Sequence, residues 1–427
     1  MPEEPKKTSE RSKPTWEVPL EDPKELKIDE PSTLAGGVPA IISSLKHTTH
    51  EMGIIRGGQA LLKVNQKGGF DCPGCGWPDP DDERAITEFC ENGVKAVAHE
   101  ATKKVITKDF FKHWSIEAIG QQSDYWLGQQ GRLTHPMFKE EGSTHYRPIA
   151  WEEAFTKMAT HLNALEDPNE AILYTSGRTS NEAAFLYQLF ARLYGTNNLP
   201  DSSNMCHESS SVALKEVIGI GKATVTLDDF QHADAIFILG QNPGTNHPRM
   251  LATLQKAAGR GCNIVSINPL PEAGTTRFIH PQEFTTWLGQ GTPLATLFLP
   301  VKINGDVALL KGIMKELLER EDQQPGTILD TTFIQQHTDG FENFAAALRQ
   351  VSWDDIVEGS GIPWEDIHKA VDIVINAKTI ICTWAMGMTQ HKNAVANMQE
   401  IINFLLLRGN IGRTGAGACP VRGHSNV

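Results

Sequence analysis

The chain has 427 residues, of which 40% are hydrophobic, and its formal net charge is −13. This length predicts two to four domains with packed cores. The negative charge disfavours nucleic acid as the main partner, although glycine-rich turns can still hold a phosphorylated cofactor. The sequence contains no run of about 18 apolar residues, so we expect no membrane span.

The N-terminal segment is charged and contains several prolines, and we expect residues 1–35 to form a mobile tail. It has neither an apolar signal core nor an Arg-Arg pair, so the sequence indicates neither secretion nor twin-arginine export. The cytoplasm is therefore the expected location. The seven cysteines are scattered and odd in number, which disfavours a disulfide framework. Cys262 and Cys382 lie in apolar runs typical of strands, and we expect both in the core.

Three cysteines mark the second predicted region, residues 36–140. Cys72 and Cys75 form a C-x-x-C pair in the run CPGCGWPDP, and Cys90 follows. Two thiolates on one tight turn suit a metal ion or an iron–sulfur cluster, and glycine lets the backbone fold around it. A zinc site would need His99 or another fourth ligand. A redox dithiol or a plain loop remains an alternative.

Beyond residue 141, apolar runs alternate with amphipathic segments. Strands are predicted over 171–174, 235–239, 262–267 and 379–383, and helices over 151–165, 181–194, 248–259, 306–319, 367–375 and 393–407. This alternation predicts an α/β fold, in which helices cover both faces of parallel sheets. Ligands of such folds bind where the strands end.

The turns after these strands are rich in Gly, Asn, Ser, Thr and Pro. Several such turns on one chain suggest a large nucleotide-like cofactor, with ordinary turn chemistry as the alternative. Neither a G-x-G-x-x-G run after a strand nor a Walker motif is present, so simple dinucleotide binding is disfavoured.

The run DSSNMCHESSS places Cys206 directly before His207. A thiolate is a soft metal ligand and an imidazole can move a proton, so this pair is the main catalytic candidate. Near the C-terminus, a run of glycines and arginines that begins at Arg408 could surround an anion. A helix end followed by a solvated loop is the alternative for that run.

Together these motifs resemble the molybdopterin oxidoreductase superfamily, the group of formate dehydrogenases and nitrate reductases, and within it the formate-dehydrogenase-like YdeP branch. The resemblance extends in order from about residue 70 to the last residue. The matching runs are FDCPGCGWPDP at 70–80, YRPIAWEEA at 146–154, SGRTSNE at 176–182, NMCH at 204–207, GQNPGTNHPRM at 240–250, GDVALL at 305–310 and GNIG at 409–412.

The resemblance implies a molybdenum or tungsten centre held as Mo-bis(molybdopterin guanine dinucleotide), and a [4Fe-4S] cluster. Cys206 would ligate the metal, His207 would assist removal of a proton or hydride, and Arg422 would orient an anionic substrate. The implied cluster ligands are Cys72, Cys75 and Cys90. The residues implied to line the pterin cofactors are Ser176, Gly177, Asn242, His247, Asn268, Gly305, Asp306, Met386 and Gln390.

Three features depart from the family pattern. Formate dehydrogenases carry glutamine two positions after the arginine, where this chain has His424, which we include among the predicted catalytic residues. The regular four-cysteine spacing is also lost. The sequence also stops at Val427.

The resemblance predicts residues 141–201 as the first part of a split α/β domain and 202–424 as the α/β domain with the metal-ligand cysteine. Residues 425–427 would start a remainder that includes a C-terminal β-barrel absent from this chain.

The sequence therefore predicts the N-terminal part of a catalytic (alpha) subunit. It would catalyse a two-electron oxidation or reduction of a small anionic substrate and exchange electrons with an unidentified partner protein. Two alternatives belong to other classes. One is a non-catalytic regulatory or binding protein that retains the fold. The other is a zinc- or thiol-based redox protein that uses Cys72 and Cys75.

Overall fold

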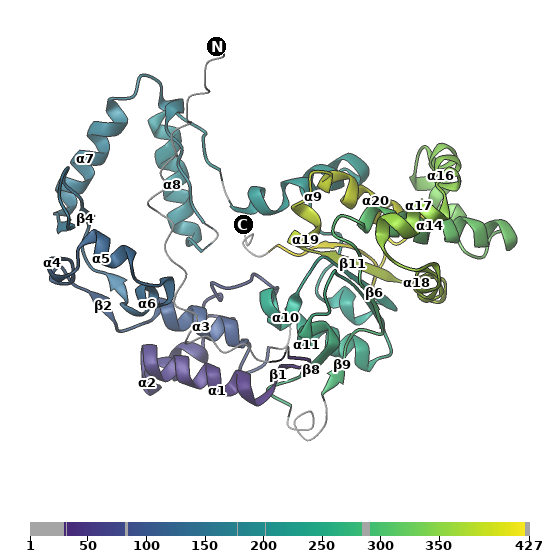
Figure 1. Cartoon of the computed structure of the whole chain (residues 1–427), viewed down its shortest axis with the longest axis horizontal. Helices are drawn as coiled ribbons and strands as arrows, with labels where there is room; N and C mark the ends of the chain where they lie inside the picture. Colours follow the sequence, from purple (N-terminus) through teal and green to yellow (C-terminus); the bar gives the residue numbers. More distant parts are fainter. Residues whose placement is uncertain are drawn as a thin grey trace, which may run out of the picture. The chain divides into compact units, whose positions relative to one another are not determined.

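The computed structural model describes residue 30 and residues 32–81, 84–176, 178–200, 202–283 and 291–422 (Figure 1). Residues 1–29 of the expected tail and residues 425–427 lie outside this range. The chain divides by its internal contacts into two compact units. The smaller unit contains Ala101–Glu170, and the larger contains Ser32–Glu100 with the described part of residues 171–427.

The smaller unit is made of short elements. They are β2 (Val105–Ile106), α4 (Phe110–His113), α5 (Ile116–Gly120), α6 (Asp124–Gln129), β3 (Arg132–Leu133), β4 (Met137–Phe138), β5 (Arg147–Pro148), α7 (Trp151–Asn163) and η3 (Pro168–Glu170). Aromatic rings pack between them, and the ring centroids of Trp114 and Trp126 lie 4.8 Å apart. Arg147 anchors the start of α7 through an ion pair with Glu153 at 2.7 Å.

A five-stranded sheet organises the larger unit. Its order is β10-β7-β6-β11-β12, and every neighbouring pair is parallel. The strands are β6 (Ala235–Leu239), β7 (Asn263–Ile267), β10 (Leu297–Leu299), β11 (Ile380–Trp384) and β12 (Gly417–Pro420). All residues of β6 and β11 are buried, as continuous apolar runs in a parallel sheet predict.

Helices cover both faces of this sheet. Phe237 and Leu239 of β6 join one core with α9 (Ser202–Ile218), α14 (Asp306–Gln323) and α20 (Ala394–Leu407). Ile236 and Ile238, which alternate with them, join a second core with α11 (Pro248–Gly259). Figure 1 shows α9 and α20 on one side of the sheet and α11 on the other. The predicted α/β fold with helices on both faces of a parallel sheet is therefore confirmed.

The remaining elements of the larger unit flank this sheet or precede it. They are β1 (Ala35–Gly36), α1 (Gly37–His47), η2 (Thr48–Met52), α2 (Ile54–Leu61), α3 (Glu91–Glu100), α8 (Asn181–Tyr194), η4 (Asp228–Gln231), α10 (Pro243–Asn246), α12 (Ala273–Thr276), β8 (Arg277–Ile279), β9 (Thr292–Pro293), α15 (Thr331–His337), α16 (Phe341–Gln350), α17 (Trp353–Ser360), α18 (Trp364–Asn376) and α19 (Met386–Thr389). None of the helices in the described part of the chain combines the length and apolar character needed to cross a bilayer.

One predicted strand does not form. Residues 171–174 are irregular, and Leu173 is buried whereas Ile172 and Tyr174 are exposed. The segment is held locally, because the Leu173 amide donates to the Asn198 carbonyl at 2.9 Å and the Asn198 side chain donates to the Ala171 carbonyl at 3.2 Å. The prediction was wrong because an apolar run of this length fits a strand but does not by itself supply a neighbouring strand to pair with. Cys262 and Cys382, by contrast, are buried as predicted.

The glycine that ends β6 gives a direct test of this packing. Gly240 has φ +55°, and a Cβ there would lie 2.8 Å from the Gly387 backbone. We expect Gly240→Ala to lower the free energy of unfolding in urea by about 2 kcal/mol or more, because it adds strain and a clash with backbone. Gly259→Ala is the control, since space is open around its Cβ. Equal stability of the two variants would contradict the packing described here.

Candidate functional site

The carboxyl ends of the strands bring most candidate residues to one edge of the sheet. Because β7, β6 and β11 pair in parallel, Ile267, Leu239 and Trp384 lie in one register across the sheet, and Pro420 of β12 follows beside Trp384. The turns after these residues carry Asn268, Asn242, Met386 and Arg422. The topology therefore collects segments that are more than a hundred residues apart in the sequence.

Glycines let these turns touch through their backbones. A Cβ on Gly387 would lie 2.6 Å from Gly240, and the Gly387 amide donates to the Gly240 carbonyl at 3.0 Å. Gly244 and Gly274 approach each other equally closely, since a Cβ on Gly274 would lie 2.6 Å from the Gly244 Cα. The turn after β6 is thus joined both to the turn after β11 and to the segment after β7.

A buried polar network supports the same edge. Gln241 is buried, and its side-chain oxygen accepts a hydrogen bond from the Thr383 hydroxyl at 3.0 Å. Its carbonyl accepts from the Asn268 side chain at 2.8 Å. Asn242 donates to the Glu272 carboxylate at 2.6 Å. Two predicted cofactor-lining residues, Asn242 and Asn268, therefore help to fix the turns themselves. The sequence analysis missed Gln241, although a polar residue directly after an apolar strand is a usable signal.

Cys206 and His207 lie at a break within α9. His207 has φ −135° and ψ 22°, which is outside the helical region, so the helix changes direction at this residue. Cys206 is half-buried and His207 is buried. The Gln390 side chain lies 3.5 Å from the Cys206 carbonyl oxygen. The kink thus presents the thiol while the neighbouring imidazole points into the protein.

Burial lowers the pKa of His207 to about 4, and the charge of Arg422 acts in the same direction. His207 is therefore neutral at ordinary pH. Arg422 is held nearby, because its Nη2 donates to the Ser211 hydroxyl at 2.8 Å and to the Gly221 carbonyl at 3.0 Å. The structure brings together three of the four predicted catalytic residues, and the fourth, His424, lies outside the described residues.

The other predicted cofactor residues have mixed surroundings. Asp306 is buried in the first turn of α14, and burial raises its pKa to about 6. At Gly305 a Cβ would meet the Gly359 carbonyl at 2.8 Å, so packing alone requires this glycine. His247 is buried where α10 meets α11. The remaining members are Ser176, Met386 and Gln390, which are exposed, and Gly177, which lies outside the described residues.

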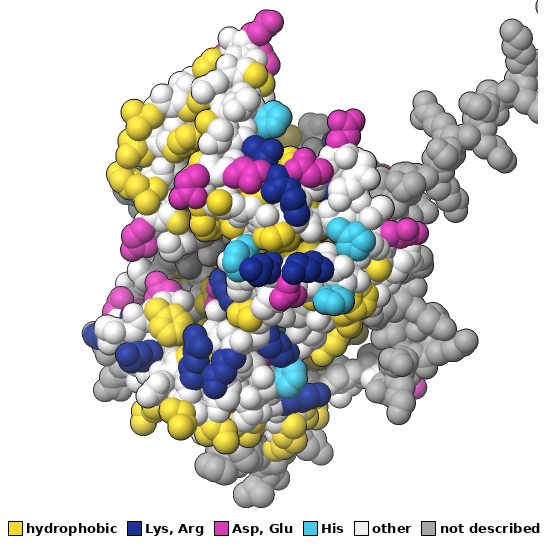
Figure 2. Space-filling model, turned by 90° about the vertical axis from the view of Figure 1, so that its left-hand side faces the viewer, with side chains coloured by type: hydrophobic (Ala, Val, Ile, Leu, Met, Phe, Trp, Pro, Cys, Tyr) yellow, Lys and Arg dark blue, Asp and Glu magenta, His cyan; other side chains and the backbone are white. Residues whose placement is uncertain are grey.

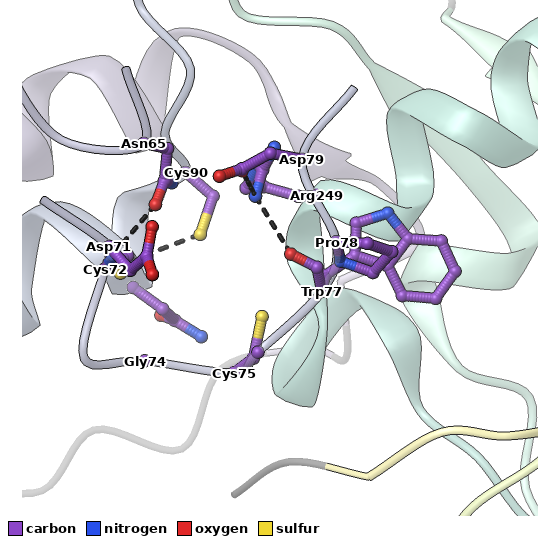
Figure 3. A pocket seen from close by; sticks show the side chains of 13 residues that line it. Asn65, Asp71, Cys72, Gly74, Cys75, Trp77, Pro78, Asp79, Cys90 and Arg249 are labelled. Carbon is purple, nitrogen blue, oxygen red and sulfur yellow. Dashed lines mark hydrogen bonds and ion pairs between the residues drawn. The ribbon is translucent and has the colours of Figure 1, made fainter. Parts of the chain in front are cut away.

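The three predicted cluster cysteines line one cavity of about 190 Å³ (Figure 3). Cys72 and Cys75 lie on the loop after α2, and Cys90 directly precedes α3. The Gly93 amide donates to the Cys90 sulfur at 3.3 Å. A Cβ on Gly93 would lie 3.1 Å from the Cys72 sulfur, so glycine keeps this wall of the cavity open.

Burial favours the protonated thiol at Cys72 and Cys90. Burial raises the pKa of Cys90 to about 12, and it also raises the pKa of Cys72. A metal or cluster would have to displace these protons, as thiolate ligation requires. Among the described residues, no group of three or more His, Cys, Asp or Glu side chains is arranged to hold a metal ion. His99, the suggested fourth zinc ligand, lies in the last turn of α3 and does not line the cavity.

Arg249 completes the wall of this cavity, and the sequence analysis did not identify it. It is 11% exposed and forms ion pairs with Asp79 at 2.6 Å and with Glu88. It also donates to the Trp77 carbonyl at 3.1 Å. Figure 3 shows Arg249 and Asp79 facing each other across from Cys75. Through these contacts Arg249 connects the loop that carries Cys72 and Cys75 to the first turn of α11.

Comparisons with known proteins agree with the resemblance seen in the sequence. The family model described as Molybdopterin oxidoreductase matches residues 132–425. "Uncharacterized oxidoreductase Rv2900c" of Mycobacterium tuberculosis is 51% identical over 394 residues, which cover 92% of this chain and 50% of that protein. Protein YdeP of Escherichia coli is 45% identical over 406 residues, covering 94% and 53%. Formate dehydrogenase H of Escherichia coli is 26% identical over 301 residues, covering 69% and 39%.

A solved structure shows the same fold. Acetylene Hydratase from Pelobacter acetylenicus superposes with a TM-score of 0.52 at 18% identity, covering 65% of this chain and 35% of that one. The chain spans about half the length of the curated relatives it matches.

The ion pairs of Arg249 give a second test. We expect Arg249→Gln to lower the free energy of unfolding by about 3 kcal/mol, because Asp79 and Glu88, at 15% and 16% exposure, lose their counter-charge. Arg413→Gln is the control, since the Arg413–Asp330 pair is 41% and 30% exposed and should cost less than about 1 kcal/mol. Urea unfolding of both variants checks this. Similar losses in the two would show that Arg249 does not anchor the cysteine loop.

Proposed function

This chain belongs to the molybdopterin oxidoreductase family, and on that premise we propose that it is the N-terminal part of a formate-dehydrogenase-like catalytic subunit. The proposed reaction is a two-electron oxidation or reduction of a small anionic substrate. The cofactor would be a molybdenum or tungsten centre on two pterin guanine dinucleotides. A [4Fe-4S] cluster would pass electrons to a partner protein.

One observation carries this proposal. Cys206, His207 and Arg422 come together at the edge of the sheet where ligands of parallel sheets bind. A half-buried thiol on a helix kink suits a soft metal, and turns joined through glycines suit a large polar cofactor. The residues present therefore fit the implied group.

Each of the three residues has a separate task. Cys206 would supply a thiolate ligand to the metal, which when bound provides the two-electron redox couple. His207 is the buried neutral group placed to hold a proton beside it. Arg422 uses only Nη2 for its two hydrogen bonds to described residues, so its other donors can hold an anion.

The groups that line the cavity of Cys72, Cys75 and Cys90 supply part of the donor set of an iron–sulfur cluster. The three thiols and the amide of Gly93 are the kinds of donor that surround iron–sulfur clusters. The fourth cysteine of the regular pattern is missing, and Asp71, Asp79 and Asn92 also line the cavity. We propose that a non-cysteine group among them completes the set.

Substitution of the metal-ligand candidate tests the proposal. We expect Cys206→Ala in the full-length protein to lose turnover by about 1000-fold or more and to lose metal from the pterin centre, because the substitution removes the proposed thiolate ligand. Cys262→Ala is the matched control, a buried thiol at the amino end of β7 that should keep both. Metal content is measured beside turnover. Full activity in Cys206→Ala would refute the assignment.

The cluster has its own test. Cys90→Ser should lower the iron content from about four per chain, with loss of the cluster's visible absorption, because one of its thiolates is removed. Cys382→Ala is the control. Cys382 is buried in β11, and its substitution should leave the iron content unchanged. An iron content that does not respond to Cys90→Ser would remove this cysteine from the ligand set, and the pterin proposal would stand without it.

A further inference from the structure

A chain of buried polar contacts leads from β11 to the ring of His207. The Trp384 indole nitrogen lies 2.9 Å from the Ser210 hydroxyl, and that hydroxyl lies 3.0 Å from Nδ1 of His207. All three residues are buried, with exposures of 0%, 0% and 2% in this order. Trp384 ends β11, and Ser210 lies on α9 one turn after the kink. No sequence motif indicated this contact.

The chemistry of the three groups fixes the direction of these hydrogen bonds. An indole N–H can only donate, so Ser210 Oγ accepts from Trp384. The hydroxyl has one proton of its own, and Nδ1 of His207 is the acceptor that the described residues offer it. If Nδ1 carried a proton instead, the Ser210 proton would be buried without an acceptor, which is costly. The Ser210 hydroxyl therefore donates to Nδ1.

The His207 ring has a second contact, with the backbone of Val421. A backbone hydrogen bond with Val421 acts to raise the pKa of His207, against the effect of burial. The Val421 amide in turn donates to the Trp384 carbonyl at 2.9 Å. Trp384, Ser210, His207 and Val421 thus form a closed ring of contacts.

We propose that Ser210 and Trp384 are positioning residues that hold His207 in the tautomer with an unprotonated Nδ1 and the ring proton on Nε2. In this arrangement Nδ1 is occupied by the Ser210 hydroxyl, and the ring proton lies on the opposite nitrogen. The tautomer follows from the contacts alone. Its consequence for turnover rests on the proposed function.

Nitrogen NMR of the full-length protein, labelled with ¹⁵N-histidine, tests the tautomer at neutral pH. The resonances of His207 are identified by their loss in His207→Gln. We expect a protonated Nε2 and an unprotonated Nδ1. The opposite tautomer, or an even mixture of the two, would overturn the proposal, and this measurement needs no substitution of Ser210 or Trp384.

Variants then test the positioning itself. Ser210→Ala should shift the His207 resonances toward a tautomer mixture and lower kcat about tenfold with little change in KM, and Ser210→Thr should restore both because it keeps the hydroxyl. Ser44→Ala, which removes a hydroxyl bonded to the Ala40 carbonyl in α1, should change neither. Unchanged His207 resonances in Ser210→Ala would refute the positioning role.

The two proposals fail in different ways. The predicted tautomer in a protein without metal and turnover would refute the proposed function and leave the positioning intact. An active, metal-containing enzyme whose His207 carries its proton on Nδ1 would refute the positioning and leave the function intact.

Discussion

The parallel pairing of β6 with β11 is the constraint on which the candidate site depends. Five residues of each strand pair in register, and all ten are buried. Because Leu239 and Trp384 end their strands opposite each other, the turns that follow must meet. That meeting places Gly240 against Gly387 and brings the Trp384 indole to Ser210 on α9. The environment of His207 is therefore a consequence of strand register.

The first turn of α11 links the two candidate centres. His247, at its start, acts electrostatically on His207. Arg249, two residues later, holds the loop of Cys72 and Cys75 through Asp79 and the Trp77 carbonyl. One short run thus serves the sheet edge and the cysteine cavity. Residues 240–250 therefore have a structural role in addition to the proposed lining of a cofactor.

Local patterns in the sequence predicted much of the fold, whereas the partners of the site residues depend on distant contacts. The strand at 235–239 was predicted correctly because five apolar residues end at a glycine. The strand at 171–174 was wrong because such runs do not reveal their neighbours. Adjacent Cys206 and His207 stood out in the sequence, but the kink between the helix segments did not. Ser210 and Trp384 are 174 residues apart, so only the sheet reveals their contact.

The measurement that tests the central claim most directly is the metal and pterin content of the natural full-length protein, purified without oxygen. We expect molybdenum or tungsten near one per chain together with the pterin guanine dinucleotide. A protein that holds neither metal nor pterin, from cells that make the cofactor, would contradict it and favour a binding protein that retains the fold.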